Sequence, residues 1–375
     1  MELGRYITQP QGYKAFILNA FPPPEGFNFP PELIQKANLA TLRLGKLDGI
    51  TQLLPDVDFF LFMYIRKDAA SSSQIEGTRA TMIDAIEAES KTADVLPEDV
   101  DDILHYIKAL NYGLRRLRDL PLSLRLIREI HRELMEGVRK THFSDPGNFR
   151  KSQNWIEGTS PNNAIFVPPP PYEMQNALND FEKFLHEKDA LLPVIKAGII
   201  HAQFETMHPF LDGNGRTGRM LITIYLHLAK LLDQPVLFLS RYFKKHQRVY
   251  YQRLNEYHNG KIEKWLDFFL DGVIETADEA VETVKQITVL REEDMRRIQA
   301  LGKTAAENTI KILPKLFQLP IVNVAKIQEW TGFTRQGAQK VINRLVALDI
   351  LKPKDNEKKY GRSFVYKRYL DIFRD

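Results

Sequence analysis

The chain of 375 residues contains no cysteine. This absence excludes disulfide bonds and zinc sites with thiolate ligands, and it is typical of a protein of the reducing cytoplasm. Long apolar runs are also missing: the longest, residues 220–232, is interrupted by His227 and Lys230 and is too short to span a bilayer. The first six residues lack the charged and then apolar pattern of a secretory leader. We therefore expect a cytoplasmic protein without a membrane segment.

A large excess of one charge is absent as well, since the net charge is only +4, but the charges are unevenly distributed. Residues 301–375 carry 15 Lys and Arg against 7 Asp and Glu, whereas the first 300 residues carry 37 against 41. A basic tail on a slightly acidic body suggests a polyanionic partner for the tail alone. A small domain that is simply basic would explain the same numbers.

Helical patterns account for most of the sequence. A chain of this length with 43% hydrophobic residues can bury a large core and has room for two or three domains. Apolar residues recur at spacings of three and four, which predicts a mainly α protein. The expected helices cover residues 31–54, 57–76, 97–118, 123–135, 174–187, 193–207, 215–232, 241–259 and 262–301.

Two short β-prone runs interrupt the helical pattern. Residues 153–157 and 164–167 are separated by the turn sequence Gly-Thr-Ser-Pro-Asn-Asn at 158–163. They predict a small β-hairpin that stands off the helical body, and such a hairpin is marginally stable unless something packs on it. Residues 1–30 are rich in proline, glycine and aromatic residues, so we expect an extended segment packed on the body.

The pattern changes after residue 301. A short helix from Val324 to Trp330 is followed by a turn at Gly332, and Thr334 can cap a second helix over the next turns. That helix is amphipathic, with apolar positions at Ala338, Val341, Ile342, Leu345 and Val346. Residues 350–352 and 363–366 favour two short strands. Helix, turn, helix and a two-stranded wing predict a C-terminal winged helix.

The expected outer surface of this winged helix suits phosphate or base contacts. It comprises Arg335, Gln336, Gln339, Lys340, Asn343 and Arg344 on the second helix, and Lys352, Lys354, Lys358, Lys359 and Arg362 in the wing. These side chains make DNA a possible partner of the C-terminal domain. Winged helices also serve as dimerisation or target-docking modules, so the fold alone does not decide the partner.

The densest chemistry lies in the twelve residues His208–Arg219, which read His-Pro-Phe-Leu-Asp-Gly-Asn-Gly-Arg-Thr-Gly-Arg between two core-facing helices. Gly213 and Gly215 allow close approach of the backbone to a ligand. The helix that begins near Gly215 would direct free N–H groups at an anion. Arg216 and Arg219 can contact different phosphates of a polyphosphate.

The same loop offers a metal ligand and a base. Asp212 supplies the hard oxygen that Mg²⁺ takes together with substrate phosphates. His208 has an ordinary pKa of about 6.5, which suits the deprotonation of a hydroxyl near neutral pH. A lone histidine or Gly-x-Gly is usually structural, but the combination predicts an enzyme that handles Mg²⁺ and phosphates. Phe210 is expected to anchor the loop against the body.

These twelve residues match the signature His-x-Phe-x-(Asp/Glu)-Gly-Asn-Gly-Arg-x-x-Arg at every specified position and so resemble the Fic family. The resemblance extends over about residues 60–270. It implies a Fic-type helical core that transfers AMP from ATP to a Ser, Thr or Tyr hydroxyl of a target protein, itself included, with release of pyrophosphate. The Gly-Asn-Gly-Arg loop fits poorly with the family's phosphotransferase branch, which has Asn-Lys-Arg.

The resemblance also implies roles for single residues. His208 would be the base and Asp212 the Mg²⁺ ligand. The ATP-binding residues would be Gly213, Asn214, Gly215, Arg216, Arg219, Tyr250 and Tyr251, with Asn214 at the α-phosphate, the two arginines at the β- and γ-phosphates, and one tyrosine near the adenine. The hairpin would be a flap that docks the target by strand addition, through Trp155, Ile156, Ile165 and Phe166. The family further suggests a homodimer.

Upstream, Ser72-Ser-Gln-Ile-Glu76-Gly77 resembles the family's inhibitory motif, (Ser/Thr)-x-x-x-Glu-(Gly/Asn). Ser72 and Glu76 are four residues apart and so share one helix face. Gly77 is a natural helix stop, which leaves Glu76 in the last turn, where the helix dipole disfavours an anion. A cationic partner would explain a carboxylate there, and the resemblance implies Arg219. Pairing would keep Arg219 from the γ-phosphate and restrain the enzyme.

These observations predict an N-terminal helical region with the inhibitory motif (1–95), a Fic catalytic core (96–300) and a winged-helix domain (301–375). A protein adenylyltransferase, that is, a nucleotidyltransferase restrained by its own chain, is the favoured function. Two alternatives stay open. The same site could remove AMP, with Glu76 placing a water, or the chain could be a DNA-binding regulator whose core senses nucleotide.

Overall fold

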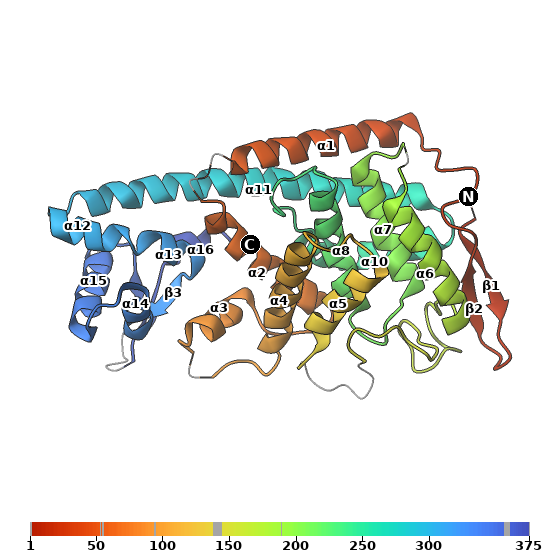
Figure 1. The fold of residues 1–375 in the computed structure, drawn as a ribbon, viewed down its shortest axis with the longest axis horizontal. Coiled ribbons are helices and arrows are strands. Elements are labelled where there is room, and N and C mark those ends of the chain that lie inside the picture. Colours follow the sequence, from red (N-terminus) through yellow and green to blue (C-terminus); the bar gives the residue numbers. More distant parts are fainter. Residues whose placement is uncertain are drawn as a thin grey trace.

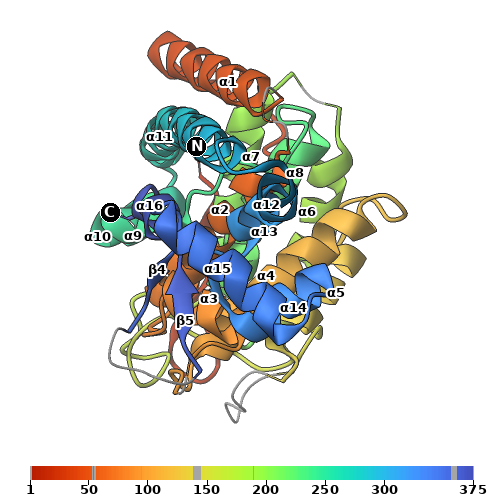
Figure 2. The same cartoon turned by 90° about the vertical axis from the view of Figure 1, so that its left-hand side faces the viewer.

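The computed structural model describes residues 2–374 except for 53, 55, 94, 138–144, 189 and 356–360. The protein is mainly helical, as the sequence predicts, and helix α11 (Ile262–Gln299) runs along its length. Helix α1 (Pro31–Thr51) packs lengthwise on α11, and the two lie side by side in Figures 1 and 2. Within the described ranges, no helix is long and apolar enough to cross a membrane.

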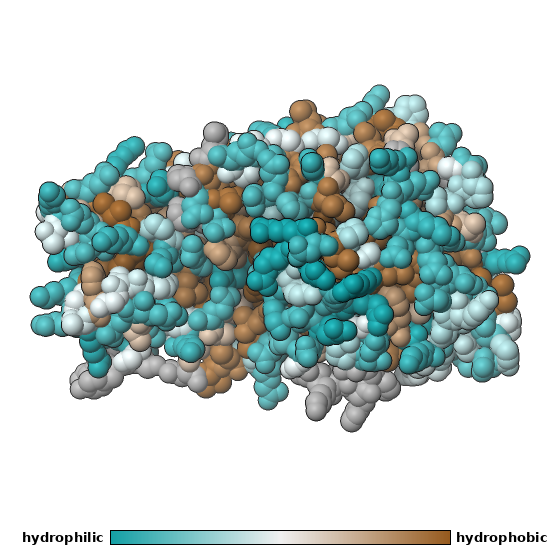
Figure 3. Space-filling view, viewed as in Figure 1, coloured by the Kyte–Doolittle hydropathy of each residue, from teal (hydrophilic) through white to brown (hydrophobic). Residues whose placement is uncertain are grey.

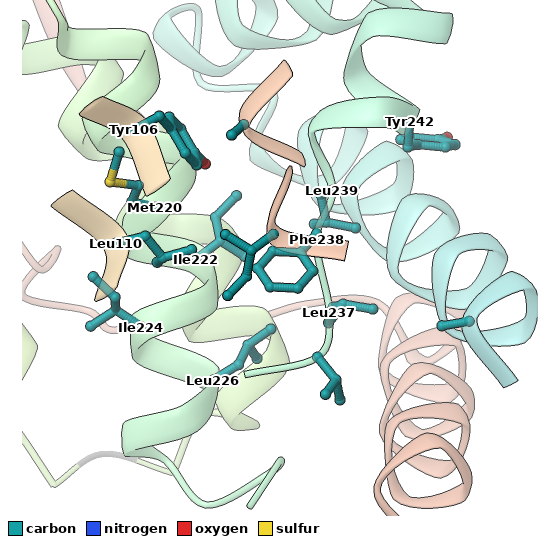
Figure 4. Close-up of a cluster of buried hydrophobic side chains, with 14 of the residues drawn as sticks. Tyr106, Leu110, Met220, Ile222, Ile224, Leu226, Leu237, Phe238, Leu239 and Tyr242 are labelled. Carbon is teal, nitrogen blue, oxygen red and sulfur yellow. The ribbon is translucent and has the colours of Figure 1, made fainter. Parts of the chain in front are cut away.

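Two buried helices form the centre of the fold. They are α7 (Pro193–Met207) and α8 (Asn214–Leu228), and almost every side chain of both is buried. The prediction that both helices face the core is confirmed, and α7 is buried on more than the one face that its apolar spacing indicated. The amphipathic helices α4 (Val100–Arg116) and α5 (Leu124–Met135) pack beside α8. Figure 4 shows Ile222 and Leu226 of α8 on the side of the helix that faces Phe238. The loop between α7 and α8 is thereby held by two rigid elements.

Three further helices complete this body. They are α6 (Pro171–His186), α9 (Ser240–Lys245) and α10 (Gln247–His258). The single helix predicted over residues 241–259 is wrong, because the backbone leaves helical geometry at His246, with φ −113° and ψ 32°. The break turns α10 so that it packs on both α7 and α11.

Helix α2 (Asp58–Ile75) lies between the body and the C-terminal elements, and contacts α4, α8, α9 and α13 (Leu313–Gln318). Its end is a left-handed stop at Gly77, with φ +96°. The N–H groups of Gly77 and Thr78 donate at 3.1 Å to carbonyls of the last turn, a Schellman arrangement. The predicted stop is confirmed, and Glu76 is the residue that caps the helix.

The sequence reading missed helix α3 (Met82–Ser90), which follows α2 directly. Thr81 and Asp84 form a reciprocal capping box at its start, with Asp84 N–H donating to Thr81 Oγ1 and Thr81 N–H donating to the Asp84 carboxylate. This Thr-x-x-Asp signal was present in the sequence.

Two hairpins lie beside one another, and the first is at the end of the molecule opposite the C-terminal elements (Figure 1). The N-terminal segment is not simply extended: β1 (Gly4–Thr8) pairs antiparallel with β2 (Lys14–Leu18), so that expectation was wrong. The predicted hairpin at 153–167 is present but shorter than expected, since its pairing is the single antiparallel bridge between Ile156 and Phe166. The N–H of Phe16 donates to the Val167 carbonyl at 2.9 Å, so the first hairpin supports the second.

The C-terminal elements contain the predicted succession of helix, turn, helix and two strands, preceded by two further helices and a third strand and followed by a short helix. They comprise α12 (Lys303–Ile310), α13, β3 (Ile321–Asn323), α14 (Val324–Thr331), α15 (Arg335–Ala347), β4 (Lys352–Pro353), β5 (Ser363–Val365) and α16 (Lys367–Asp371). The strands form an antiparallel sheet in the order β3-β5-β4. Residues 95 and 300, where we expect domain boundaries, lie in the connections that precede α4 and α12.

Candidate active site

The loop between α7 and α8 is closed by its own polar side chains. Two left-handed residues turn the backbone, His208 with φ 46° at the end of α7 and Gly213 with φ 78° at the start of α8. The buried Asn214 accepts from the N–H of Phe210 and donates to the carbonyl of the same residue, both at 2.8 Å. We expected Asn214 to face a phosphate, and in this structure its side chain instead holds the loop.

Two residues that the sequence reading missed fix this loop from outside. Arg150 is buried, and its guanidinium donates to four backbone carbonyls, including those of His208 at 2.9 Å and Met207 at 3.3 Å. Burial lowers the pKa of Arg150 to about 10. Asn154 donates to the Phe210 carbonyl at 2.9 Å. Both are isolated polar residues without a spacing pattern, so nothing in the sequence marked them.

His208 lies at the inner lip of the loop as a neutral imidazole. Burial, with the charge of Arg150, lowers the pKa of His208 to about 4. Its Nδ1 lies 3.4 Å from the carbonyl oxygen of Glu205, which can only accept. The ring proton is therefore on Nδ1, and Nε2 keeps a lone pair for an incoming proton.

Arg219 is buried on α8 and its guanidinium is directed at the end of α2. Its Nε donates to Ser72 Oγ at 2.9 Å, and its Nη2 donates to the Ser72 carbonyl at 3.0 Å and to Glu76 Oε1 at 2.6 Å. The Glu76–Arg219 contact expected from the sequence is thus present. A guanidinium has five N–H donors, so the three hydrogen bonds to Ser72 and Glu76 use most of them.

The Glu76 carboxylate sits over the first turn of α8. A Cβ placed on Gly215 would lie 2.3 Å from Glu76 Oε1, so the glycine is what lets the carboxylate approach the helix start. Desolvation of the Glu76 carboxylate against α8 opposes its ionisation, but the charges of Arg219 and Arg216 outweigh this and lower the pKa of Glu76. Glu76 is unfavourably placed at the end of its own helix and favourably placed at the start of α8. The Glu76 carboxylate therefore occupies a position at the start of α8 that would suit an anionic ligand.

Arg216 and Asp212 lie on the other side of this helix start. The Arg216 guanidinium is buried, with Nη1 3.9 Å from Asp102 and Nη2 3.8 Å from Asp212. His131, another residue missed from the sequence, donates through Nε2 to the Asp212 carbonyl at 2.9 Å and stacks on Phe210. Phe210 is fully buried, as expected of an anchor.

The donor set at Asp212 fits Mg²⁺ only in part. Its side chain is 42% exposed, so a carboxylate oxygen can reach an ion at the lip of the loop. Among the described residues no group of three His, Cys, Asp or Glu could hold a metal ion. One carboxylate is what Mg²⁺ uses when substrate phosphates and waters supply its other ligands. The residues therefore fit an ion that arrives with a nucleotide.

A cavity of about 570 Å³ opens between the loop and the hairpin. It is lined by Glu76, Glu205, His208, Gly215 and Arg219 at one end and by hairpin and α10 residues at the other. Tyr250 is buried, and its hydroxyl lies 2.8 Å from His201 Nε2, whereas Tyr251 is 40% exposed. Both tyrosines line the cavity, and Arg216 and Asp212 do not.

Two titratable residues in this cavity were missed. Glu205 is buried behind His208, its Oε1 has no hydrogen-bond partner among the described residues, and burial raises its pKa to about 8. His258, at the end of α10, is buried with both ring nitrogens unpartnered in the described part of the chain, and burial lowers its pKa to about 3. Perturbed groups of this kind are common at functional sites.

The hairpin presents two side chains outward and one inward. Trp155 and Ile165 are 39% and 59% exposed, whereas Phe166 is buried and stacks on His258 with ring centroids 3.9 Å apart. Ile156 forms the bridge and lines the cavity. The four residues predicted for the flap thus lie together beside the cavity, with apolar surface left open.

Comparison with known families agrees with this geometry. Residues 121–226 match the Fic/DOC family and residues 34–115 match the Fic/DOC family N-terminal region, and together these cover half of the chain. The protein therefore belongs to the Fic/DOC family.

Its relatives include the Protein adenylyltransferase Fic of Aedes aegypti, with 33% identity over 177 residues. That match covers 46% of this chain and 32% of the relative. A probable protein adenylyltransferase of Aquifex aeolicus is 31% identical over 192 residues, with 50% and 54% covered. The chain thus spans between a third and about half of the length of these relatives.

Solved structures share the fold. A Fic family protein from Desulfovibrio desulfuricans has a TM-score of 0.58 at 17% identity, with 91% of this chain and 97% of that chain covered. A Fic domain containing signaling protein from Bacteroides thetaiotaomicron has a TM-score of 0.54 at 18% identity, with 66% and 97% covered. The helical core is therefore a Fic fold, as the sequence predicts.

Proposed function

We propose that this protein transfers AMP from ATP to a Ser, Thr or Tyr hydroxyl of a target protein, itself included, and that Glu76 restrains the reaction. The observation that carries the proposal is the neutral His208 next to a cationic helix start with an accessible cavity. The adenylyltransferase names of its relatives support the same activity.

His208 would act as the general base. As the target hydroxyl oxygen bonds to the α-phosphorus of ATP, its proton passes to His208 Nε2. The bond from the α-phosphorus to the oxygen bridging to the β-phosphorus breaks, and pyrophosphate leaves with that electron pair. His208 then returns its proton to solvent. A base that is neutral at pH 7 and oriented through Nδ1 suits this role.

The phosphates would take the seat that the Glu76 carboxylate now holds. The free N–H groups at the start of α8, Arg216 and Arg219 would bind and orient them. Asp212 would hold Mg²⁺, and the ion supplies positive charge against the phosphate oxygens when it is bound. Tyr250 and Tyr251 line the cavity beyond Arg219, where the nucleoside would extend.

The target would dock on the hairpin. Within residues 153–167, all of which the structure describes, the two arms of the hairpin pair with each other only at the Ile156–Phe166 bridge, which leaves strand positions for a target segment. Trp155 and Ile165 offer exposed apolar surface to side chains of that segment. This placement would bring a hydroxyl past the hairpin toward His208, because both border one cavity.

The restraint rests on competition for Arg219. Three of its hydrogen bonds go to Ser72 and Glu76 on α2, so a γ-phosphate has to displace them or bind without Arg219. A hydrogen bond to a charged group contributes about 1.5–3 kcal/mol, which corresponds to a factor of about 10 to 100. Nucleotide would therefore bind in an unproductive pose until α2 releases the arginine.

The reverse reaction, removal of AMP from a modified target, is a second candidate. The Glu76 side chain is 37% exposed and borders the same cavity as His208, so it could orient a water toward an AMP ester. Incubation of an AMP-modified target with the unaltered protein and with Glu76→Gly separates the two. Faster removal with Glu76 intact would favour this candidate.

Other predictions from the sequence stay predictions: a homodimer, a cytoplasmic location, and a DNA-binding regulator whose core senses nucleotide. In the last case loss of His208 would leave regulation intact.

Glu76→Gly tests the restraint. Self-modification with labelled ATP should rise by about 10- to 100-fold, because Arg219 is freed. Glu187→Gly is the matched control, since Glu187 is exposed and caps the end of α6 as Glu76 caps α2. An equal rise in both variants, or none in Glu76→Gly, would contradict the restraint.

His208→Ala in the Glu76→Gly background tests the base. General base catalysis contributes roughly 10²- to 10⁴-fold, so labelling should fall by at least that lower factor while ATP binding by calorimetry is kept. Persistent labelling would refute the assignment. Mass spectrometry of lysate treated with Glu76→Gly and ATP would then identify the targets by their AMP adducts.

A further inference from the structure

The outer face of α15 is a basic surface that the proposed function does not use. Thr334 caps the helix by accepting from the Gly337 N–H at 3.2 Å. Four apolar residues face inward and are buried: Ala338, Val341, Ile342 and Leu345. The outward residues, exposed or half-buried, are Arg335, Gln336, Gln339, Lys340, Asn343 and Arg344, which we call the α15 face.

The α15 face contains three cations and no acid. Two other lysines of the C-terminal elements have acidic partners close by, Lys326 with Glu329 at 2.7 Å and Lys352 with Asp349 at 3.2 Å. Among the described residues, Arg335, Lys340 and Arg344 form no ion pair. Uncompensated positive charge on one exposed helix surface attracts a polyanion.

The face is also open to a large partner. Figure 2 shows α15 with α14, β4 and β5 at the end of the molecule, with no other element in front of them. In Figure 3 that end, at the left, is mostly hydrophilic. The 13 residues of α15 span about 20 Å, which is long enough to lie along a groove of a duplex.

The side chains of the α15 face favour a nucleic acid over a protein as its partner. A protein interface is built around an apolar or aromatic centre, and none of the large exposed hydrophobic side chains of the described ranges lies between residues 301 and 374. Guanidinium, ammonium and amide groups are the side chains that bond phosphates and base edges. A helix fits the major groove of B-DNA, whereas the major groove of duplex RNA is too narrow for it.

We propose that the α15 face binds duplex DNA in the major groove. Arg335, Lys340 and Arg344 supply the charge. The exposed Gln336 is the amide that would reach a base edge, since Asn343 Oδ1 accepts from Gln339 Nε2 at 2.9 Å. The wing contributes less than its sequence suggested, because Lys352 is bound to Asp349 and Lys354 to Glu87 of α3. Lys358 and Lys359 lie outside the described residues. The proposal is independent of AMP transfer.

The test compares two charge-matched triple variants of the full chain. The first is R335Q/K340Q/R344Q. The second is R125Q/K183Q/K285Q, which removes three exposed cations from α5, α6 and α11, each close to a local acid. Binding to a labelled random-sequence duplex of about 20 base pairs is followed by fluorescence anisotropy over a range of salt. Circular dichroism melting verifies that both variants are folded.

The unaltered protein and the control should bind alike, and the α15 variant should bind at least about 10-fold more weakly at low salt. The slope of log affinity against log salt should become less steep by about 2.7, about 0.9 for each cation removed. Equal slopes in the two variants would overturn the proposal, as would no duplex binding by the unaltered protein or equal binding of duplex RNA. The His208→Ala protein should bind DNA normally, so failure of the proposed transfer would not affect this result.

Discussion

The start of α8 and the outer face of α15 are both cationic helix surfaces, but they differ in burial and in their partners. Arg216 and Arg219 of α8 are buried and lie near acids, with Glu76 held at 2.6 Å by Arg219. Arg335 and Lys340 of α15 are exposed and unpaired within the described residues. A buried, prearranged seat suits a small polyanion in one pose, whereas an exposed face suits a long polyanion in many registers.

Only at the start of α8 can a single side chain of the protein compete with an anionic ligand for the arginine. The guanidinium of a buried arginine is held in one position, so a single carboxylate can stay paired with it. The absence of a side chain at Gly215 leaves the space in which the Glu76 carboxylate lies. An exposed arginine is hydrated and mobile, and one side chain gains little by pairing with it. The difference predicts that substitutions at the two surfaces have separable effects.

Arg219→Ala in the Glu76→Gly background should have the largest effect. Loss of a prearranged donor to the developing charge costs about 10²- to 10³-fold in rate, so labelling with ATP should fall by that factor. Arg335→Ala in the same background should leave labelling within about 2-fold, since a single exposed cation contributes little. A comparable loss in both variants would break the comparison.

A change in salt concentration should affect DNA binding and labelling differently, although by a smaller factor than the arginine substitutions do. Three phosphate contacts give a slope of about −2.7, so DNA binding should weaken by about 40-fold between about 50 and 200 mM salt. ATP-dependent labelling by Glu76→Gly should change far less, because buried charges are screened weakly. A steep loss of labelling over the same range would show that the α8 seat is reached by solvent ions.

The sequence predicted the loop better than its supports. Residues His208–Arg219 form the predicted loop between two buried helices, and Ser72, Glu76 and Gly77 lie at the end of α2, as their spacing predicted. Arg150, His131 and Glu205 could not be found in this way. Arg150 and His131 act through contacts with residues 58 and 81 positions away, and Glu205 is distinguished only by its burial. Helix α3 was missed although its capping box was visible, and the N-terminal hairpin was missed because the aromatic, proline-rich segment favoured an extended chain.

The rate of self-modification by Glu76→Gly should stay level on the acid side of pH 7 and fall at alkaline pH. His208 has a pKa of about 4, below its ordinary value, so the base stays neutral and the rate stays level as the pH falls from 7 to about 5. A histidine with an ordinary pKa would lose about 30-fold at pH 5. Burial raises the pKa of Glu205 to about 8 in the unaltered protein, so at alkaline pH this carboxyl ionises near the phosphates and the rate should fall. Glu205→Gln should abolish this alkaline fall, and a fall that persists would contradict the assignment.

Ser72→Ala should have the smallest effect, and it tests whether α2 restrains the enzyme by holding Arg219. Ser72 Oγ accepts from Arg219 Nε at 2.9 Å, so its loss removes one of three bonds that hold the arginine and leaves the Glu76 carboxylate in place. Self-modification should rise by about 5- to 10-fold, less than with Glu76→Gly. Ser73→Ala is the matched control, since Ser73 is buried on the same helix and its hydroxyl bonds the Asp102 carbonyl instead, at 3.5 Å. If both serine variants activate equally, loosening of α2 rather than release of Arg219 relieves the restraint.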